Sequence, residues 1–508
     1  MGVLTGKGVL IRRLELWFPM TKQAVIIGAG LGGLATAIRL AYGGWAVTVL
    51  EQGSRPGGKM NRFERAGFTF DTGPSLITLP HVFERLFKLG GVDFHKILSP
   101  VRLDPLFEYR FGSDTRFNYS SQLPDLTAEF EKFTGSTQDV DGLYRFLELG
   151  AKLYNLSEKT FFDRPPMAKP RFKDLPLLLG APKRHGLGNY KKAVQRHFKN
   201  PHIRQIFERY PTYVGASPKD AVGMLALIPY MELAFGGWYV PGGLYRIVEE
   251  LCEIALRAGI RFEYNNTVAD IVTKNGRATG VATKTGSFFK ADAVISNADP
   301  GAIDRITQGN SGRELKPEQR SMSGFVMLIG LNKKLHGLRH HTVCFSDDYD
   351  REFSQVFSER KFPDDPTVYV NVPSITDPSM APPGGESVFV MANAPADIET
   401  WTPEFEVEAV QRVRERLANS GMPDLFVDAR FIDCWTPARL ESQYSTPGGS
   451  IYGQVSHGWK GTIFRPSLKD RKIQNLFYVG GGTHPGGGTP TVLMSAEIVS
   501  EMVGSVAN

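Results

Sequence analysis

The chain has 508 residues, which is long enough for two or more domains around a large core. Its net charge of +6 is modest for this length, and without a recognisable nucleic-acid-reading module it argues against a nucleic-acid binder. The three cysteines, Cys252, Cys344 and Cys434, lie far apart in the sequence. This spacing argues against a disulfide framework or a thiolate metal cluster and fits a reducing compartment.

The first twenty residues, "MGVLTGKGVLIRRLELWFPM", do not form a secretory signal, because the basic pair follows the first apolar residues and no small-residue cleavage site follows an apolar core. Position six is glycine, so the myristoylation pattern fails as well. Met20 stands directly before the first predicted strand. We interpret residues 1–19 as a leader outside the structured domains; the alternative is a short membrane-surface segment.

A glycine-rich turn follows the first predicted strand, "QAVII" at 23–27. Gly28, Gly30 and Gly33 fit the G-x-G-x-x-G pattern, and residues 31–41 have helical spacing. The first glycine allows a tight turn, the second lets the backbone approach a pyrophosphate, and the third lets helix and strand pack closely. The free N–H groups at the helix N-terminus favour an anion there. This arrangement predicts a dinucleotide site.

A second apolar run, "WAVTVL", ends at Glu51, 18 residues after Gly33. This is close to the spacing of about 20 residues expected for the acid that binds the ribose hydroxyls. Gly57, Gly58 and Lys59 follow directly, where a simple NAD domain would continue with a helix. A glycine pair with a cation could instead border an extended dinucleotide.

Residues 222–240, "VGMLALIPYMELAFGGWYV", form the most apolar stretch and approach the length of a membrane span of about 20 residues. Pro229 and Glu232 disfavour a span, so we predict a tunnel wall or buried core. Residues 259–299 alternate apolar and polar positions around an Asn-Gly turn at 275–276, which predicts an antiparallel hairpin that returns to the main sheet.

The chain resembles the bacterial and fungal phytoene desaturase family of flavin-dependent carotenoid desaturases, from Lys22 to near the C-terminus. Beyond the glycine turn and "RPGGK", the likeness rests on "FDTGPSLIT" (70–78), "WYVPGGLYRIVEEL" (238–251), "VISNADP" (294–300), "HHTVCFSDDY" (340–349), "ITDPSMAPPG" (375–384) and "NLFYVGGGTHPGGGTP" (475–490).

The resemblance implies an α/β fold, with a discontinuous Rossmann-like FAD-binding domain of the glutathione-reductase or amine-oxidase type and an inserted α+β substrate domain. We place the FAD-binding domain at 20–105, 236–300 and 430–508, and the polyene domain at 106–235 and 301–429. The residues assigned to the cofactor are Gly28, Gly30, Gly33, Glu51, Gly58, Lys59, Val268, Gly481, Gly482 and Thr483. Val268 would hold the adenine through backbone, and the last three would face the flavin end.

Two features depart from most phytoene desaturases. The terminal motif closes with Gly488-Thr489-Pro490 instead of Gly-Val-Pro or Gly-Ile-Pro, and the chain contains "PGGSIYGQVSHGW" at 447–459. Both features resemble those of family members that act late in the pathway, on the ends of the carotenoid chain. These members are the hydroxycarotenoid 3,4-desaturases and the terminal-methyl oxygenases. The chemistry class stays the same, while the substrate stays open.

Desaturation needs a hydride acceptor, which oxidised flavin supplies, together with alignment of the polyene and exclusion of water. Because this chemistry needs no fixed set of catalytic side chains, the catalytic residue is unknown from sequence; the candidates are His484, Asp71 and Glu232. For His484 we favour a structural role, and for the two acids capping or solvation. His340 and His341 are adjacent, so on a strand they would face opposite sides; no metal site is predicted.

Residues 164–199 hold ten Lys/Arg against one acid, Asp174. Because carotenoids reside in bilayers, we expect a segment within 164–240 to dock on anionic lipid, although a solvated basic face explains the same residues. The expected location is cytoplasmic, peripheral on the inner face of the cell membrane. Three functions stay open: a desaturase passing electrons to a quinone or dioxygen, a non-redox carotenoid isomerase, and a non-catalytic polyene carrier.

Overall fold

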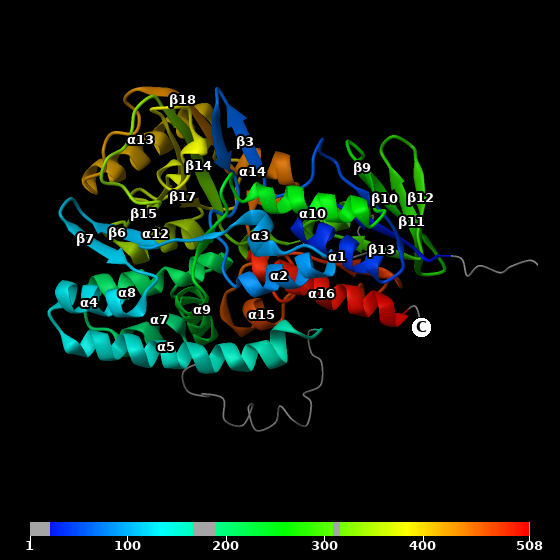
Figure 1. Cartoon of the computed structure of the whole chain (residues 1–508), viewed down its shortest axis with the longest axis horizontal. Coiled ribbons are helices and arrows are strands. Elements are labelled where there is room, and N and C mark those ends of the chain that lie inside the picture. Colours follow the sequence, from blue (N-terminus) through cyan, green and yellow to red (C-terminus); the bar gives the residue numbers. More distant parts are fainter. Residues whose placement is uncertain (1–20, 166–187, 308–314, 507–508) are drawn as a thin grey trace, which may run out of the picture.

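The computed structural model describes residues 21–165, 188–307 and 315–506, and the predicted leader lies outside these ranges (Figure 1). A parallel sheet lies towards one end of the molecule and a larger mixed sheet towards the other. Helices lie beneath both sheets in this view.

The parallel sheet has the strand order β19-β13-β1-β2-β9 among the described residues. Its strands come from three distant parts of the chain: β1 (Gln23–Ile27), β2 (Ala46–Leu50), β9 (Arg261–Glu263), β13 (Ala293–Ser296) and β19 (Leu476–Tyr478). Because β1 pairs in parallel with both β2 and β13, it occupies the centre. The predicted βαβ start of the chain is confirmed.

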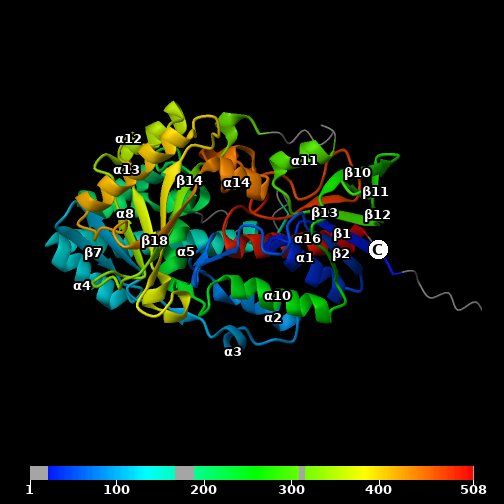
Figure 2. The same ribbon diagram turned by 90° about the horizontal axis from the view of Figure 1, so that it is seen from above.

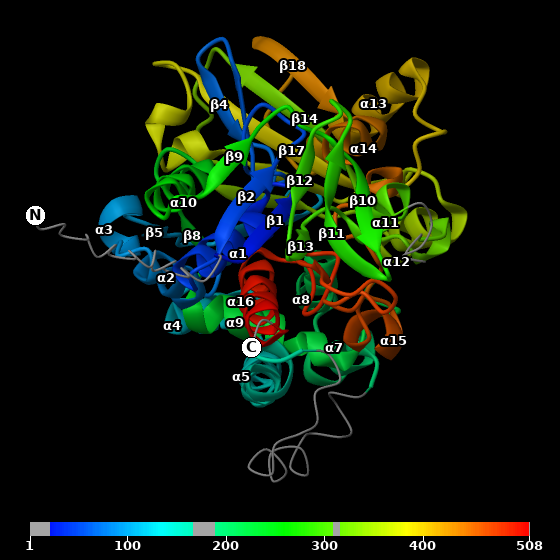
Figure 3. The ribbon, with the colours of Figure 1, turned by 90° about the vertical axis from the view of Figure 1, so that its right-hand side faces the viewer.

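Both faces of this sheet are buried, which explains why its strands read as continuous apolar runs. Ala24 and Ile26 join the core formed with the helices α1 (Leu31–Tyr42) and α16 (Thr489–Val506). Val25 and Ile27 point the other way and pack with the small antiparallel sheet. Figures 2 and 3 show these elements from two further sides, and in Figure 3 α16 lies below the parallel sheet. α16 contacts α1.

The small sheet consists of β10 (Val268–Lys274), β11 (Arg277–Thr283) and β12 (Phe288–Lys290). Asn275 and Gly276 form the turn between β10 and β11, with φ of +51° and +72°. Two positive φ values are those of the tight hairpin turn that Asn-Gly favours. The predicted hairpin, which leads back through β13 into the main sheet, is confirmed.

The larger sheet has the order β18-β14-β17-β16-β15-β6-β7. Its strands are β6 (Phe107–Phe111), β7 (Thr115–Tyr119), β14 (Ser323–Leu331), β15 (His341–Cys344), β16 (Val368–Asn371), β17 (Glu386–Ala394) and β18 (Ala429–Trp435). All pairs are antiparallel except β15 with β6. The helix α13 (Pro403–Asn419) packs on one face through Ala409 and Val413.

Helices fill the space beside β6 and β7 (Figure 1): α4 (Leu123–Thr134), α5 (Thr137–Ser157), α7 (Tyr190–His197), α8 (Pro201–Glu208), the short η3 (Tyr210–Val214) and η4 (Gly223–Ala226), and α9 (Leu227–Phe235). The remaining longer elements are α2 (Pro80–Leu89), α3 (Phe94–Leu98), α10 (Tyr245–Arg257), α11 (Pro300–Ile306), α12 (Tyr349–Ser354), α14 (Pro437–Tyr444) and α15 (Gly458–Ile463). Short strand pairs are β3 (Arg62–Arg65) with β4 (Phe68–Asp71), and β5 (Val101–Arg102) with β8 (Trp238–Tyr239).

The apolar stretch 222–240 forms η4, α9 and β8, and most of its side chains are buried. Within the described ranges, no helix has the length and apolar character needed to cross a bilayer. The prediction of buried core is confirmed. Five of the ten basic residues at 164–199 lie at 166–187, outside the described residues.

The predicted domain boundaries stay a prediction. The parallel sheet draws its strands from the segments assigned to the FAD-binding domain. However, β18 lies in the larger sheet, although most of its residues fall inside the segment 430–508.

Candidate cofactor-binding site

The predicted cofactor residues gather at the carboxyl edge of the parallel sheet. β1 ends before Gly28, β2 before Glu51, β13 before Asn297 and β19 before Val479. Parallel sheets bind ligands at this edge because the loops there converge. Segments that are far apart in sequence therefore meet at one site.

The first glycine turn has the geometry that the motif predicts. Gly28 has φ of +93°, and its N–H donates to the carbonyl of Leu50 at 2.7 Å. A Cβ atom on Gly33 would lie 2.1 Å from the carbonyl oxygen of Gly28, so only glycine allows this close packing of helix on strand.

The N-terminus of α1 fits an anionic group. Gly30 is the N-cap residue, no side chain caps the helix, and its first turn contains no acid. Leu31, Gly32 and Gly33 are nevertheless buried. Buried helix N–H groups without a capping side chain need an acceptor, and a pyrophosphate would supply one.

Glu51 connects the glycine turn to the loop that follows β2. Its Oε2 accepts from the N–H of Ala29 and its Oε1 from the N–H of Gly53, both at 2.8 Å. The carbonyl of Glu51 accepts from the N–H of Asn266 at 2.9 Å, which brings Val268, the first residue of β10, into the same neighbourhood. The structure thus brings Glu51 and Val268 together with the glycine turn.

The segment 57–59 lies against this turn. The N–H of Gly57 donates to the carbonyl of Ala29 at 2.9 Å, and a Cβ on Gly58 would lie 3.1 Å from the Cα of Gly30. Lys59 donates from Nζ to the carbonyl of Ile451 at 2.6 Å. Burial lowers the pKa of Lys59, while the charge of Asp299 acts in the opposite direction.

The C-terminal glycine loop completes the site. The carbonyl of Gly481 accepts from Arg465 at 3.0 Å, and a Cβ on Gly482 would lie 2.4 Å from Pro300. Thr483 is buried, and its hydroxyl donates to the carbonyl of Gly480 at 2.9 Å. Gly481 and Gly482 thus pack against Arg465 and Pro300, and the Thr483 side chain is held within its own loop.

Sequence reasoning quoted "VISNADP" but missed Asn297, which connects the two glycine loops. Its Nδ2 donates to the carbonyl of Val479 at 2.9 Å. A Cβ on Gly32 or Gly480 would lie within 2.9 Å of this nitrogen, and a Cβ on Gly30 would lie 2.6 Å from Oδ1. An asparagine directly after a strand of the parallel sheet was the available signal.

Together, the uncapped α1 N-terminus, the acid after β2 and the two glycine loops fit FAD. The nucleotide half would lie on Gly28–Gly33 and Glu51, and the flavin half beside the loop from Gly480. When bound, FAD supplies a two-electron acceptor for carbon-bound hydrogen.

Replacing Glu51 with alanine is expected to weaken FAD binding by about 10- to 100-fold, because a charge-assisted hydrogen bond contributes about 1.5–3 kcal/mol. Titration of the apoprotein with FAD, followed by flavin fluorescence, measures this change. Glu131→Ala, at an exposed position of α4, is the control. Equal affinity of the Glu51 and Glu131 variants would contradict the assignment.

His484 has a structural setting. It is buried, its Nε2 lies 2.8 Å from the carbonyl of Phe161 and 2.9 Å from that of Arg164, and burial lowers its pKa to about 4. A neutral imidazole that donates to carbonyls holds the loop against the end of η1 (Glu158–Phe162). This agrees with the structural role favoured from sequence.

Asp71 caps α10 rather than facing solvent. Its carboxylate accepts from the N–H groups of Leu244 at 2.9 Å and Tyr245 at 3.2 Å. Burial raises its pKa to about 6, although the two backbone hydrogen bonds lower it. The capping alternative describes its contacts.

This pKa predicts a pH-dependent contribution to stability. Between about pH 4 and 6 the folded state binds the Asp71 proton more tightly than the unfolded state, so this contribution is lost as pH rises through the window, by at most about 3 kcal/mol. Asp71→Asn removes this titration. As pH rises from 4 to 7, the unfolding midpoint of wild type should therefore fall relative to that of Asp71→Asn. The midpoints of Asp125→Asn, exposed on α4, should run parallel to those of wild type. Parallel curves for Asp71→Asn would contradict it.

Glu232 is not solvated, contrary to the expectation from sequence. It is 1% exposed, and its carboxylate accepts from the hydroxyls of Tyr210 at 2.5 Å and Tyr213 at 2.8 Å. Burial raises its pKa, and these two hydrogen bonds lower it. The tyrosines come from η3, so only the tertiary fold provides the partners that let α9 bury an acid.

The histidine pair also differs from expectation. His340 precedes β15, so the two side chains do not alternate across a strand; their ring centroids are 4.5 Å apart. His340 contacts Thr376 through Nδ1, and His341 contacts Tyr369.

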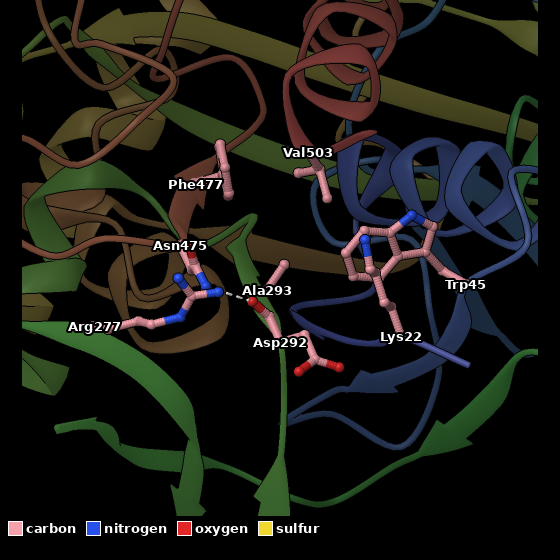
Figure 4. Close-up of a pocket in the computed structure, with 8 residues that line it drawn as sticks. All are labelled: Lys22, Trp45, Arg277, Asp292, Ala293, Asn475, Phe477 and Val503. Carbon is pink, nitrogen blue, oxygen red and sulfur yellow. Dashed lines mark hydrogen bonds between the residues drawn. The ribbon is translucent and has the colours of Figure 1, made fainter. Parts of the chain in front are cut away.

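A small pocket opens at the opposite edge of the parallel sheet (Figure 4). Its lining residues are Lys22, Trp45, Arg277, Asp292, Ala293, Asn475, Phe477 and Val503. Lys22, Trp45, Asp292 and Asn475 each stand at or just before the start of a strand, and Asn475 donates to the carbonyl of Asp292 at 2.7 Å. The pocket thus lies at the amino ends of the strands, away from the predicted cofactor residues.

Residues 31–503 match the pattern of the flavin containing amine oxidoreductases. The 4,4'-diaponeurosporene oxygenase of Staphylococcus aureus (strain USA300) is 32% identical over 502 residues, which cover 95% of this chain and 98% of that protein. The 4,4'-diapolycopene oxygenase of Methylomonas sp is 31% identical over 493 residues, with the same coverage of 95% and 98%. A redesigned putrescine oxidase of known structure superposes with a TM-score of 0.61 at 12% identity, over 96% of this chain and 98% of that one.

These comparisons confirm the predicted fold class, with its Rossmann-like FAD-binding domain, and FAD as the cofactor. They also confirm the resemblance to flavin-dependent enzymes of carotenoid metabolism that the motifs carried. The likeness to the putrescine oxidase concerns the fold alone.

Proposed function

The chain belongs to the flavin containing amine oxidoreductase family, and from this premise we propose that it uses FAD to oxidise the chain end of a carotenoid-type polyene. The observation that carries the proposal is the full-length similarity to two proteins named as carotenoid oxygenases. The Gly488-Thr489-Pro490 ending and the segment 447–459 support the same branch.

One aromatic side chain, Tyr452, lies beside the candidate cofactor site. Tyr452, in the segment 447–459, packs against Gly487 of the C-terminal loop, where a Cβ would lie 2.8 Å from its ring. The same ring would lie 2.6 Å from a Cβ on Gly215, at the end of η3. Side chains of this kind can align a polyene and exclude water, while conjugation delocalises the positive charge left when a hydride departs.

A second candidate is desaturation of CH₂–CH₂ units, favoured by the motifs from "FDTGPSLIT" onward. Both reactions require the same flavin. They differ in the carbon that is oxidised, so the product distinguishes them.

Mixing the holoenzyme with phytoene, lycopene, a 1-hydroxylated carotenoid and a linear polyene with terminal methyl groups, first without and then with dioxygen, tests the proposal. An oxygenated chain end supports terminal oxidation, with its oxygen atom taken from water in the anaerobic reaction or from dioxygen in the aerobic one. Flavin bleaching with a longer conjugated system supports desaturation. A changed cis/trans ratio without net oxidation would identify an isomerase. No change with any polyene would leave only a carrier and would refute the proposal.

We also propose that the enzyme works as a peripheral protein on the cytoplasmic face of the membrane and passes electrons to a quinone or dioxygen. The ten basic residues at 164–199 support docking on anionic lipid. Flotation with anionic and neutral vesicles at two salt concentrations measures it. Binding that ignores both lipid charge and salt would contradict docking.

A further inference from the structure

Arg209 is a partly buried cation without an anionic partner. It follows α8 at the start of η3, and its guanidinium donates only one hydrogen bond, to the hydroxyl of Tyr109 at 3.3 Å. It forms no ion pair with any described residue. Burial lowers the pKa of Arg209, but Tyr213, Tyr109 and Glu232 act in the opposite direction and the net shift is upward. Both oxygens of Glu232 accept hydrogen bonds from tyrosines.

Aromatic rings surround this guanidinium. Its carbon Cζ lies 4.7 Å from the ring centre of Phe107, 5.8 Å from that of Tyr109 and 5.3 Å from that of Tyr213. Cation–π contacts stabilise the charge but leave its N–H groups without acceptors. The other N–H groups of Arg209 are not among the fully enclosed side-chain atoms, so they are open to a further acceptor.

His341 supplies a second unpaired donor nearby. Its Nδ1 lies 3.2 Å from Nδ2 of Asn371 and 2.7 Å from the hydroxyl of Tyr369. Because an amide nitrogen only donates, Nδ1 is the acceptor and Nε2 carries the hydrogen. This Nε2 is buried and has no partner. The ring lies 5.1 Å from that of Phe107, which Arg209 also contacts.

Tyr349 supplies a third polar group without a hydrogen-bond partner in the described part of the chain. It is 8% exposed and its buried hydroxyl has no hydrogen-bond partner among the described residues. Its ring contacts Phe345 at 5.4 Å, and Phe345 stacks on Tyr109 at 5.7 Å, beside Arg209. Burial is the main cause of both pKa shifts, since it lowers the pKa of His341 and raises that of Tyr349. The charge of Arg209 is a smaller cause and lowers both pKa values.

All three groups can donate a hydrogen bond, so a ligand oxygen that accepts would satisfy each of them. We propose that Arg209, His341 and Tyr349 bind the oxygen-bearing end of the polyene, a terminal carboxylate or aldehyde, and so select substrates or products that are already oxidised at one end. This rests on the proposed function and names its substrate class. A guanidinium suits such an end group because it offers several N–H donors in one plane.

The cluster is placed beside the cofactor site through Tyr452. Arg209 precedes η3 and Gly215 follows it. Gly215 packs on Tyr452, and Tyr452 packs on Gly487 of the C-terminal loop. Burial raises the pKa of Tyr452 to about 12, and the charge of Arg209 lowers it, which is consistent with this proximity. If Arg209 held one end of the polyene, it would fix how the polyene lies relative to the C-terminal glycine loop.

Binding of two matched probes tests the proposal: a linear polyene hydrocarbon and the same polyene with one terminal carboxylate, each in detergent micelles. The holoenzyme is kept reduced, so that no oxidation occurs, and tryptophan fluorescence reports the Kd. Arg209→Met should raise the Kd of the carboxylate by about 30-fold or more and leave that of the hydrocarbon within about twofold. Arg209→Lys should fall between wild type and Arg209→Met.

Tyr349→Phe removes only the unpartnered hydroxyl, so the fold should persist even if Arg209→Met loses flavin. It should raise the Kd of the carboxylate by about three- to tenfold, whereas Tyr144→Phe, exposed on α5, should change neither Kd. Equal changes for both probes, or none, in the Arg209 and Tyr349 variants would overturn the proposal. A wild-type enzyme that binds neither polyene would remove the proposed function as well, which separates the two failures.

Discussion

Gly30→Val is expected to give a folded protein that purifies almost without flavin. Gly30 has φ of −67° and ψ of 172°, which valine adopts without strain. A Cβ there would lie 2.6 Å from Oδ1 of Asn297, the end of a side chain, and no other neighbour would lie within 3.4 Å. The new side chain would instead occupy the backbone surface that approaches the pyrophosphate. We expect FAD affinity to fall by about 100-fold or more, a change of about 3 kcal/mol.

The ratio of flavin to protein absorbance after purification, and after incubation with excess FAD, measures this effect. Gly504→Ala, in α16, is the matched control because a Cβ there meets nothing within 4 Å. Gly33→Ala should differ from both variants, since its Cβ would collide with backbone and lower the yield of folded protein. A Gly30→Val protein with a full complement of flavin would refute the cofactor site.

Glu232→Ala is expected to cause the largest loss of stability, about 3–5 kcal/mol. The substitution leaves the hydroxyls of Tyr210 and Tyr213 without their acceptor and opens a cavity in α9. Tyr210 also contacts the hydroxyl of Tyr119 at 3.0 Å, so the disturbance should reach β7. It also removes the nearby negative charge that acts on Arg209.

Thermal unfolding of the FAD-loaded protein measures this loss as a midpoint lowered by several degrees. Glu232→Gln keeps one acceptor oxygen and should lose less than half as much. Tyr213→Phe leaves one carboxylate oxygen unpaired and should cost about 1–3 kcal/mol, while Glu131→Ala on the surface of α4 should have no measurable effect. An Ala variant as stable as wild type would show that the buried hydrogen bonds contribute nothing.

The N-terminal part of the candidate cofactor site was predictable because its residues are close together in sequence. A strand, a tight turn, a helix and an acid within 30 residues force Gly28, Gly30, Gly33 and Glu51 into one constellation, since only one backbone path connects them. The hairpin at Asn275-Gly276 was equally predictable, because two positive φ values select those residues. The segments 57–59 and 480–483 needed the family resemblance, since nothing local ties them to the turn.

Neither the network around Glu232 nor the cluster around Arg209 could be read from the sequence. Their partners lie on β6, β7, β15, η3, α9 and α12, and each contact depends on how these elements pack. A glutamate in an apolar run looked unfavourable because its two tyrosines lie 19 and 22 residues away in sequence. The prediction for the histidine pair was wrong because β15 begins only at His341.

The amino-acid sequence alone therefore determined the nucleotide-binding turn, the hairpin and the cofactor class, because short-range steric limits and backbone hydrogen bonds decide them. Tertiary structure alone decided which buried charges find partners and which do not. Desolvation makes an ionised side chain costly unless neighbours from distant segments satisfy it. Glu232 is satisfied in this way and Arg209 is not, and this difference sets the expected chemistry of the ligand.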